Sequence, residues 1–263
     1  MKIMDKTARL LKDSGIENYL FEAKIINDHA KQNNLDVYAL IKRRISREPL
    51  QYIIGEWEFY GDIYKLNKDC LIPRPETELL TEYIIDNARP GAVILDLCSG
   101  SGCVSISALK RREDLTAVLI DISSGAIQIS RVNAELNKVA DRTKFYCLDV
   151  LKNAPQIMKI CAPDLPDLIA ANPPYLSAGE LDQIRSEKSE LSHEPEAAFF
   201  GGDDGLDFYR KIIAGYKNIC REFVFECGIG QYKKICEIFA AHGFNFKIIN
   251  DYNKIERIIV GGN

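Results

Sequence analysis

The sequence predicts an α/β protein with a doubly wound, largely parallel sheet of seven strands, and three observations support this fold class. From residue 92 onward, short apolar runs alternate with longer stretches of helical periodicity. Several apolar runs stop abruptly, most clearly where residues 168–171 meet Asn172-Pro173-Pro174-Tyr175. The last two apolar runs have no helical stretch between them. Strands that alternate with helices pair in parallel through right-handed crossovers, whereas the last two should form an antiparallel hairpin at one edge.

Residues 1–50 differ from the rest because they show helical periodicity without strand alternation. Ser14-Gly15 and Asn33-Asn34 interrupt this pattern, and Asp36 is suited to capping a helix. We expect two to four short helices, which form a small N-terminal helical domain over residues 1–50.

The residue pattern changes from helical to strand-like periodicity at residue 50. Residues 50–61 alternate with period two and contain glycines, which predicts a β-hairpin and a linker over residues 51–72. In the following Ile72-Pro73-Arg74-Pro75-Glu76-Thr77-Glu78, the prolines favour an extended chain and Thr77 precedes a helix through residues 79–85. Residues 73–263 then form the second, larger domain.

The remaining elements follow from the alternation. We expect strands at residues 92–97, 115–120, 144–148, 167–171, 222–225, 244–249 and 257–260. We expect helices at residues 103–111, 124–138, 206–218 and 231–241, and a loop rich in Glu and Ser before residue 206.

Composition limits the class of protein. The chain has 263 residues, enough for one large domain or a domain with a small partner, and 46% hydrophobic with 27% charged residues is ordinary for a soluble globular protein. A net charge of −4 argues against a dedicated duplex-DNA binder. Residues 1–50 carry ten Lys/Arg and seven Asp/Glu, which gives a formal charge of +3. A solvent-exposed charged surface explains this excess as well as binding to a polyanionic partner does.

Targeting and metal signals are weak. The N-terminus lacks the apolar stretch of a signal peptide, and no window approaches the roughly 18 apolar residues of a membrane span. The eight cysteines include no C-x-x-C pair, so we expect reduced, structural thiols in a cytoplasmic protein. Three histidines without paired spacing do not favour a zinc site, and we expect no metal.

The loop after the first strand of the sheet is suited to a cofactor. It reads Asp96-Leu97-Cys98-Ser99-Gly100-Ser101-Gly102, and its glycines let the backbone approach an anionic group at a helix N-terminus. Ser105 stands where the dinucleotide pattern needs a third glycine, which disfavours NAD. Asp121 ends the next strand, where an acid binds ribose hydroxyls, or alternatively caps the helix that follows; Asp149 ends the third strand.

Asn172-Pro173-Pro174-Tyr175 places an amide and an aromatic ring at the carboxyl end of a strand, where ligands bind in open α/β sheets. Taken alone, this segment could equally be a turn. Together with Asp96-x-x-x-Gly100-x-Gly102 and the acid after the second strand, it resembles the class I S-adenosylmethionine-dependent methyltransferases, which have a Rossmann-like fold.

Flanking motifs narrow the resemblance to the HemK/PrmC family of protein-(glutamine-N5) methyltransferases. The similar segments are Arg47-x-Pro49-Leu50-Gln51-Tyr52-Ile53, the segment of residues 72–78, Glu194-Pro195 leading to Gly201-Gly202-Asp203-Asp204-Gly205-Leu206, and Glu226-x-Gly228-x-x-Gln231. They span about residues 40 to 260. The sequence departs from the family at Cys98 and Ser99, where Gly and Thr are common, and between Asp251 and Arg257, where an Ala-Gly is missing.

The resemblance implies transfer of a methyl group from S-adenosyl-L-methionine to the amide nitrogen of the glutamine in the Gly-Gly-Gln motif of class 1 peptide chain release factors. The implied cofactor residues are Cys98, Ser99, Gly100, Ser101, Gly102, Asp121, Asp149, Val150 and Asn172. The implied substrate residues are Arg74, Glu76, Asn172, Pro173, Pro174 and Tyr175, with Asn172, Pro173 and Tyr175 catalytic. Asn172 and the Pro173 carbonyl would accept the two amide hydrogens, Tyr175 would pack on the amide plane, and no general base is required.

Two other readings remain open. The same Asn-Pro-Pro-Tyr segment suits an adenine-N6 or cytosine-N4 nucleic-acid methyltransferase, although such enzymes normally carry a basic recognition domain. A non-catalytic, ribosome-associated binding module could also keep the fold. We expect a monomer with no nucleic-acid or membrane partner, and we read His193 as a hydrogen-bonding loop residue rather than a base.

Overall fold

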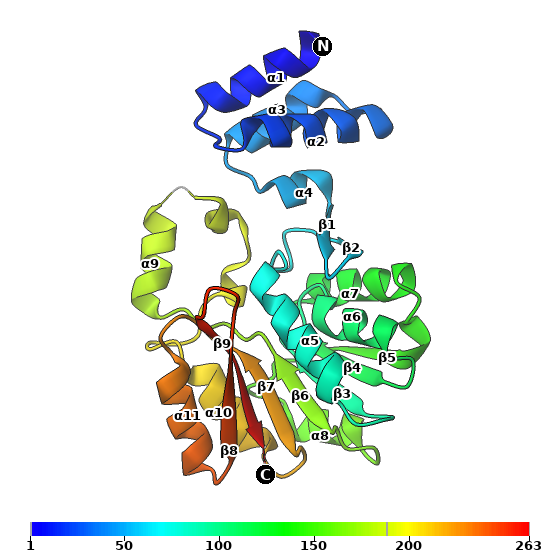
Figure 1. Ribbon diagram of the computed structural model, residues 1–263, viewed down its shortest axis with the longest axis vertical. Coiled ribbons are helices and arrows are strands. Elements are labelled where there is room, and N and C mark those ends of the chain that lie inside the picture. Colours follow the sequence, from blue (N-terminus) through cyan, green and yellow to red (C-terminus); the bar gives the residue numbers. More distant parts are fainter. Residues whose placement is uncertain (1, 188, 263) are drawn as a thin grey trace.

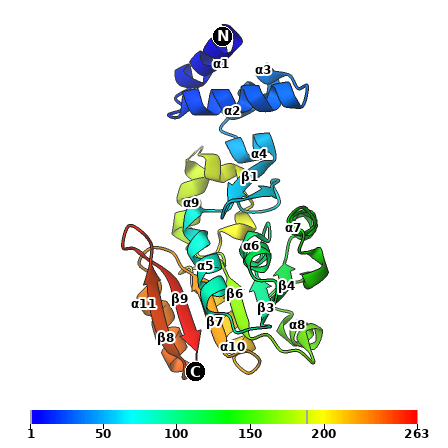
Figure 2. The same cartoon turned by 45° about the vertical axis from the view of Figure 1, so that its right-hand side comes forward.

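The computed structural model describes residues 2–187 and 189–262. Within these ranges the chain forms a seven-stranded sheet flanked by helices, a separate two-stranded hairpin and a group of N-terminal helices (Figure 1). The N-terminal helices lie at one end of the molecule and the C-terminal strands at the other, as both views show (Figure 2). In the described part of the chain, no helix combines the length and apolar character needed to cross a bilayer.

The seven-stranded sheet has the order β5-β4-β3-β6-β7-β9-β8. Its strands are β3 (Val93–Leu97), β4 (Thr116–Asp121), β5 (Thr143–Cys147), β6 (Leu168–Ala171), β7 (Glu222–Glu226), β8 (Asn245–Asn250) and β9 (Glu256–Gly262). β3 pairs in parallel with β4 and β6, and β9 runs antiparallel to both β7 and β8. The predicted doubly wound sheet with an antiparallel edge hairpin is therefore confirmed, and its winding changes direction between β3 and β6, where such sheets bind ligands.

Two helical layers cover the sheet because alternate strand side chains are apolar on both faces. The first layer consists of α5 (Glu78–Asn87), α6 (Cys103–Arg111) and α7 (Ser124–Leu136). The second consists of α8 (Ala154–Cys161), α10 (Asp207–Tyr216) and α11 (Tyr232–Ala241). Ile94 and Leu119 belong to the first core and Leu95 and Phe225 to the second, which is the period-two alternation of a strand.

Three helices lie within the described part of residues 1–50, in agreement with the expected two to four. They are α1 (Lys2–Asp13), α2 (Tyr19–Gln32) and α3 (Val37–Ile45), and α4 (Leu50–Ile54) follows them. The carboxylate of Asp36 caps α3 by accepting the backbone N–H of Tyr38 at 2.9 Å. Arg44 on α3 is buried and binds Glu22 of α2 at 2.5 Å and, much later in the chain, Glu190.

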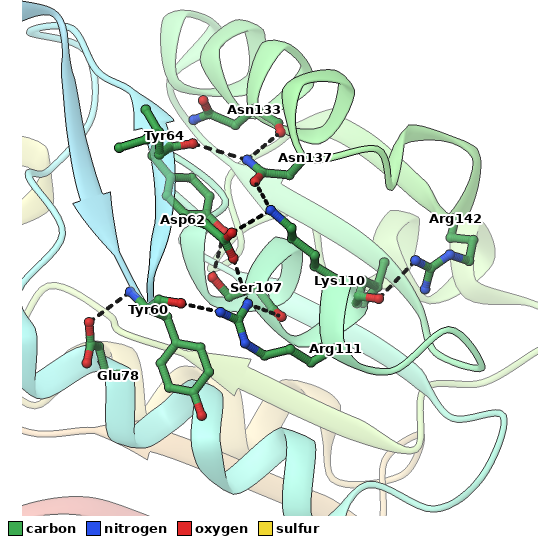
Figure 3. A network of polar contacts seen from close by, with 12 residues as sticks. Tyr60, Asp62, Tyr64, Glu78, Ser107, Lys110, Arg111, Asn133, Asn137 and Arg142 are labelled. Atoms are coloured by element: carbon green, nitrogen blue, oxygen red, sulfur yellow. Dashed lines mark hydrogen bonds and ion pairs between the residues drawn. The ribbon is translucent and has the colours of Figure 1, made fainter.

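The hairpin of β1 (Glu56–Phe59) and β2 (Asp62–Lys65) lies on α6 and α7 (Figure 3). Tyr60 and Gly61, both at positive φ (51° and 75°), form its two-residue turn. Asp62 pairs with Arg111 at 2.6 Å and with Lys110. The side-chain carbonyl of Asn133 on α7 accepts the backbone N–H of Lys65 at 2.7 Å. The hairpin is thus attached to the two helices that contact residues 98–102, the loop after β3, which we call the cofactor loop: α6 directly follows it and α7 binds it.

The expectation of strand structure from residue 50 is wrong for residues 50–54, which form α4. Leu50 and Ile53 lie three residues apart, and both are buried in the core of the N-terminal helices. The same five residues satisfy a helical and a period-two pattern, so packing decides between them. Gly55, at φ 78°, ends this helix and lets the chain enter β1.

Besides α4, two helices are additional to the prediction. Residues 154–161 form α8, and part of the expected loop before residue 206 forms α9 (Ala178–Ser186), which begins with a capping box of Ser177 and Glu180. Short 3₁₀ turns cover η1 (Pro75–Thr77), η2 (Ala140–Arg142), η3 (Glu190–His193) and η4 (Glu196–Ala198). Thr77 precedes α5 without capping it, because its hydroxyl is used elsewhere.

Candidate functional site

A cavity of about 470 Å³ lies at the carboxyl ends of β3, β4, β5 and β6, beside the change in winding direction. The loop after β3 contributes residues 98–101 to its wall. Asp121 and Asp149 follow β4 and β5, and Asn172 and Pro174 follow β6. Four segments that are distant in the sequence therefore meet at one cavity because their strands are parallel.

The cofactor loop keeps its shape through backbone bonds and one necessary glycine. The N–H of Gly102 binds the carbonyl of Ser99 at 2.8 Å, and the N–H of Ser99 binds the carbonyl of Ile120 at 3.1 Å. Gly102 has φ 77°, and a β-carbon there would lie 2.8 Å from Ile106 Cδ1. Gly102 does not line the cavity itself, but only glycine permits this close turn into α6.

Helix α7 supports the same loop from behind. The hydroxyl of Ser130 donates to the carbonyl of Gly100 at 2.7 Å, and the amide of Asn133 donates to the carbonyl of Ser101 at 2.9 Å. Both side chains are fully buried. Neither residue was among the predicted site residues, although two polar residues three positions apart on one buried helix face are a signal that could have indicated them.

Asp121 connects the end of β4 to the cofactor loop. Its Oδ2 accepts the N–H of Gly100 and its Oδ1 accepts the N–H of Ser123, both at 2.8 Å. Burial raises the pKa of Asp121, although these backbone donors oppose the shift. The cap of α7 is Ser123, whose hydroxyl oxygen accepts the N–H of Ala126 at 3.1 Å. Each Asp121 oxygen retains further acceptor capacity for a ligand.

The cavity suits an adenosyl group on the residues present. The hydroxyl of Ser99 is buried on the cavity wall and has no hydrogen-bond partner within residues 2–187 and 189–262, so a ligand could satisfy it. A β-carbon at Gly100 would meet no atom within 4 Å, which leaves open space beside the loop. Burial disfavours ionisation of Asp149, but hydrogen bonds from Lys152 and from the N–H of Leu151 outweigh it and lower its pKa. Two carboxylates and a free hydroxyl are appropriate partners for ribose hydroxyls and an adenine amine.

Asn172 lies on the cavity wall, where two further residues hold it through hydrogen bonds. Its Nδ2 donates to the hydroxyl oxygen of Thr77 at 3.2 Å, and Thr77 in turn donates to Oε2 of Glu226 at 2.6 Å. Thr77 lines the cavity, whereas Glu226 lies behind it with 1% of its surface exposed. Burial raises the pKa of Glu226 to about 7, against the hydrogen bond from Thr77.

Tyr175 is oriented by a different set of contacts. Its backbone carbonyl accepts Nε2 of Gln231 at 2.7 Å, and Gln231 also accepts the N–H of Gly228 at 3.1 Å. A β-carbon at Gly205 would clash with that same carbonyl. Tyr175 lines a second cavity of about 230 Å³, together with Arg257. Burial raises the pKa of Tyr175 to about 12, so its hydroxyl stays protonated at neutral pH.

Arg74 lies on the wall of the main cavity and fixes a neighbouring loop. It binds Oε1 of Glu194 at 2.5 Å, and Oε2 of Glu194 accepts the N–H of Ile72 at 2.9 Å. The following Pro195 and Ala198 also line the cavity. His193 binds the backbone carbonyl of Ser46 through Nε2 at 3.1 Å, which matches its reading as a loop residue.

The structure brings most of the predicted site residues together, and their roles stay predictions. Those on the wall of the main cavity are Arg74, Cys98, Ser99, Gly100, Ser101, Asp121, Asp149, Val150, Asn172 and Pro174. Those outside that wall are Glu76, Gly102, Pro173 and Tyr175. Wall residues absent from the predicted set include Thr77, Asp96, Ile122 and Phe208. Ile122 directly follows Asp121 and could have been inferred, whereas nothing local indicates Phe208.

Comparisons with known proteins agree with this geometry. The family model of the methyltransferase small domain matches residues 75–187. The release factor glutamine methyltransferase of Thermodesulfovibrio yellowstonii is 34% identical over 259 residues, which cover 95% of this chain and 88% of the relative. That of Geobacter sulfurreducens is 32% identical and covers 99% of this chain and 95% of the relative. Among solved structures, the hMettl16 catalytic domain in complex with MAT2A 3'UTR hairpin 6 has a TM-score of 0.59 at 15% identity. The match covers 85% of this chain and 81% of that one, and at this identity it shows a similar fold alone.

Proposed function

Because this chain belongs to the family of release factor glutamine methyltransferases, we propose that it methylates the glutamine of the Gly-Gly-Gln motif in class 1 peptide chain release factors. The methyl group goes to the side-chain amide nitrogen. The observation that carries this proposal is Asn172, which lies on the cavity wall and whose Nδ2 is already bound to Thr77. Its Oδ1 is thereby left to accept a hydrogen from a substrate amide.

The fold is that of a class I methyltransferase, and S-adenosyl-L-methionine is its cofactor. When bound, this cofactor supplies a methyl group activated by attachment to a sulfonium. Asp121 would bind the ribose hydroxyls, Asp149 and Val150 would lie near the adenine, and Ser99 and Gly100 would contact the remainder. The free hydroxyl of Ser99 and the open space beside Gly100 support this assignment.

The chain's own contribution to the reaction is alignment. A glutamine nitrogen is a poor nucleophile because its lone pair is delocalised into the carbonyl. The Asn172 Oδ1 and the Pro173 backbone carbonyl accept its two hydrogens, which holds the nitrogen in place and favours the positive charge that develops on it. Tyr175 packs against the amide plane, and Arg74 and Glu76 shape the entrance. Alignment of this kind contributes up to about 7–11 kcal/mol.

The N-terminal helices are proposed to contact the release factor. Residues 1–50, which carry a formal charge of +3, form the recognition domain, residues 51–72 the linker and residues 73–263 the catalytic domain. Apolar side chains of Leu20, Phe21 and Tyr38 are exposed on α2 and α3, where a protein partner could cover them. We propose that the protein acts as a cytoplasmic monomer on a protein substrate, without a nucleic-acid substrate or a membrane partner.

Labelled S-adenosyl-L-methionine tests the proposed substrate directly. The protein is incubated with a class 1 release factor, with the same factor carrying Ala in place of the Gly-Gly-Gln glutamine, or with oligonucleotides. We expect label on the intact release factor alone, located by peptide mass spectrometry on that glutamine. Label on oligonucleotides only, or on both release factors equally, would overturn the proposal.

A further inference from the structure

We propose that Glu226 is a positioning residue that determines, through Thr77, which atom of the Asn172 side-chain amide faces the substrate. The effect of this orientation on catalysis rests on the proposed function, whereas the orientation itself does not. The three residues come from the end of β7, from η1 and from the end of β6.

The geometry forms a directional chain of two hydrogen bonds. Thr77 Oγ1 lies 2.6 Å from Oε2 of Glu226 and 3.2 Å from Nδ2 of Asn172. Thr77 and Glu226 are buried, with 3% and 1% of their surfaces exposed. A threonine hydroxyl has one hydrogen and two acceptor positions. When it donates to a carboxylate, it can only accept from Asn172, so Asn172 must present its NH₂ to Thr77 and its Oδ1 to the substrate.

Protonation of Glu226 reverses this chain. A carboxylic acid at Glu226 donates its hydrogen to Thr77, and the Thr77 hydroxyl then has its own hydrogen free for Asn172. The Asn172 amide satisfies that donor by turning its Oδ1 toward Thr77. Its NH₂ then faces the substrate glutamine, and an amide NH₂ cannot accept a hydrogen bond. The pair of acceptors proposed for the substrate nitrogen, Asn172 Oδ1 and the Pro173 carbonyl, is therefore complete only when Glu226 is ionised.

The surroundings of Glu226 allow both states near neutral pH. Burial raises its pKa to about 7. The Thr77 hydrogen bond and the positive charges of Arg257 and Arg74 lower the pKa, and Glu76 raises it. The other titratable groups near Glu226 are thiols and phenols, which are neutral at pH 7 and whose pKa values burial raises further; they are Cys103, Tyr175, Tyr209 and Cys227.

The first test is the pH dependence of kcat on a release factor between pH 5.5 and 8.5. We expect kcat of the natural protein to fall about tenfold for each pH unit below about 7 and to be constant above it. Glu226→Gln should lack this change and turn over at least tenfold more slowly at pH 8, because a neutral amide at residue 226 can present either a donor or an acceptor to Thr77. If kcat of E226Q still fell below about pH 7, the fall would belong to the ionisation of another group, such as Asp96, and the proposal would be overturned.

Matched variants separate positioning from a merely structural role. Thr77→Ser keeps the hydroxyl and should keep the pH dependence of kcat. Thr77→Val should show no change of kcat near pH 7, and its kcat should be at least tenfold lower. Glu222→Gln is the control on the same strand, because Glu222 accepts the Tyr83 hydroxyl at 3.0 Å at the end of β7 remote from Asn172. It should keep the natural profile. If T77V retained the full profile, the chain through Thr77 would be wrong.

A spectroscopic readout makes the orientation testable without turnover. The side-chain NH₂ signal of Asn172 is identified in ¹⁵N spectra as the one absent from Asn172→Ala. It should shift with a midpoint near pH 7 in the natural protein and not in E226Q. A signal that titrates in a protein that fails to methylate release factors supports the orientation and refutes the proposed function. A signal that does not titrate overturns the orientation.

Discussion

At the scale of single residues, the proposed role of the site depends on the two polar atoms of the Asn172 side-chain amide. Asn172 lines the cavity and its Nδ2 is bound to Thr77, so Oδ1 is the atom of the amide left to accept a hydrogen from a ligand. A hydrogen-bond acceptor held by the fold costs no reorganisation when charge develops on the substrate nitrogen. The residue should therefore affect turnover far more than cofactor binding.

Asn172→Ala tests this separation. We expect kcat to fall by roughly 10²-fold or more, by analogy with the loss of one preorganised hydrogen-bonding group. S-adenosyl-L-methionine affinity, measured by calorimetry, should change only a few-fold. The control is Asn87→Ala, an exposed asparagine at the end of α5, which should leave both quantities unchanged. Near-normal turnover in N172A would refute the assigned role.

A pair of glycines tests whether the Tyr175 backbone must be held in place. Gly205 (φ 74°) and Gly55 (φ 78°) have nearly the same left-handed conformation, so alanine should destabilise each by about 1 kcal/mol. Only at Gly205 would the new β-carbon also clash with the carbonyl of Tyr175, whereas at Gly55 it meets no atom within 4 Å. We expect Gly205→Ala to lower kcat roughly 10- to 100-fold and Gly55→Ala to leave it unchanged, as steady-state kinetics would show. Equal effects on kcat would contradict this reading.

At the scale of elements, one buried arginine joins the N-terminal helices to the loop beside the cavity. Arg44 on α3 binds Glu22 on α2 and Glu190 in η3, and η3 leads into Glu194 and Pro195. Breaking a buried ion pair from one side leaves an uncompensated charge, which is costly. This link therefore affects both the stability of the helical end and the position of the cavity wall.

The adjacent arginine supplies a matched control. Arg43 pairs with Glu48 at 2.5 Å, but 42% of its side chain is exposed, against 3% for Arg44. We expect Arg44→Met to lower the free energy of unfolding by about 3 kcal/mol and Arg43→Met by less than about 1 kcal/mol, measured by urea denaturation. Similar losses in both variants would show that the Arg44 cluster does not behave as a buried ion pair.

At the scale of the whole molecule, the buried carboxyl group of Glu226 should make stability depend on pH. Burial raises its pKa from 4.5 to about 7, so the folded protein holds this proton more tightly than the unfolded chain. The free energy of unfolding should therefore decrease as pH rises from about 4.5 to about 7. The ionised form required at the site is thus the less stable form of the fold.

Comparison of the natural protein with Glu226→Gln isolates this effect. The neutral isostere removes the ionisation, so the natural protein should lose on the order of 3 kcal/mol relative to E226Q between pH 4.5 and pH 8. Urea denaturation at these two pH values gives the difference. An unchanged difference would mean that the Glu226 carboxyl is solvated in the folded protein.

Much of the fold, and the residues of the cavity wall that directly follow strands, could be predicted from local pattern. The seven strands, the C-terminal hairpin and the Asp36 cap follow from apolar periodicity and residue type, which act over a few neighbouring positions. The prediction for residues 50–54 was wrong because five residues fit both a helical and a strand period. The burial of Leu50 and Ile53 against the N-terminal helices favours the helix.

The sequence by itself determined the seven strands of the main sheet in their order along the chain, most of the helices, the glycine loop and the position of the Asn-Pro-Pro-Tyr segment at a strand end. Only the tertiary structure decided what lies behind that segment. Thr77 and Glu226 are 149 residues apart, and Asn133 supports a loop 32 residues before it. Such contacts depend on which strands are neighbours and on which helix covers them. Periodicity along the chain carries no record of this, because it reports only the environment of each face and not the identity of the residue opposite.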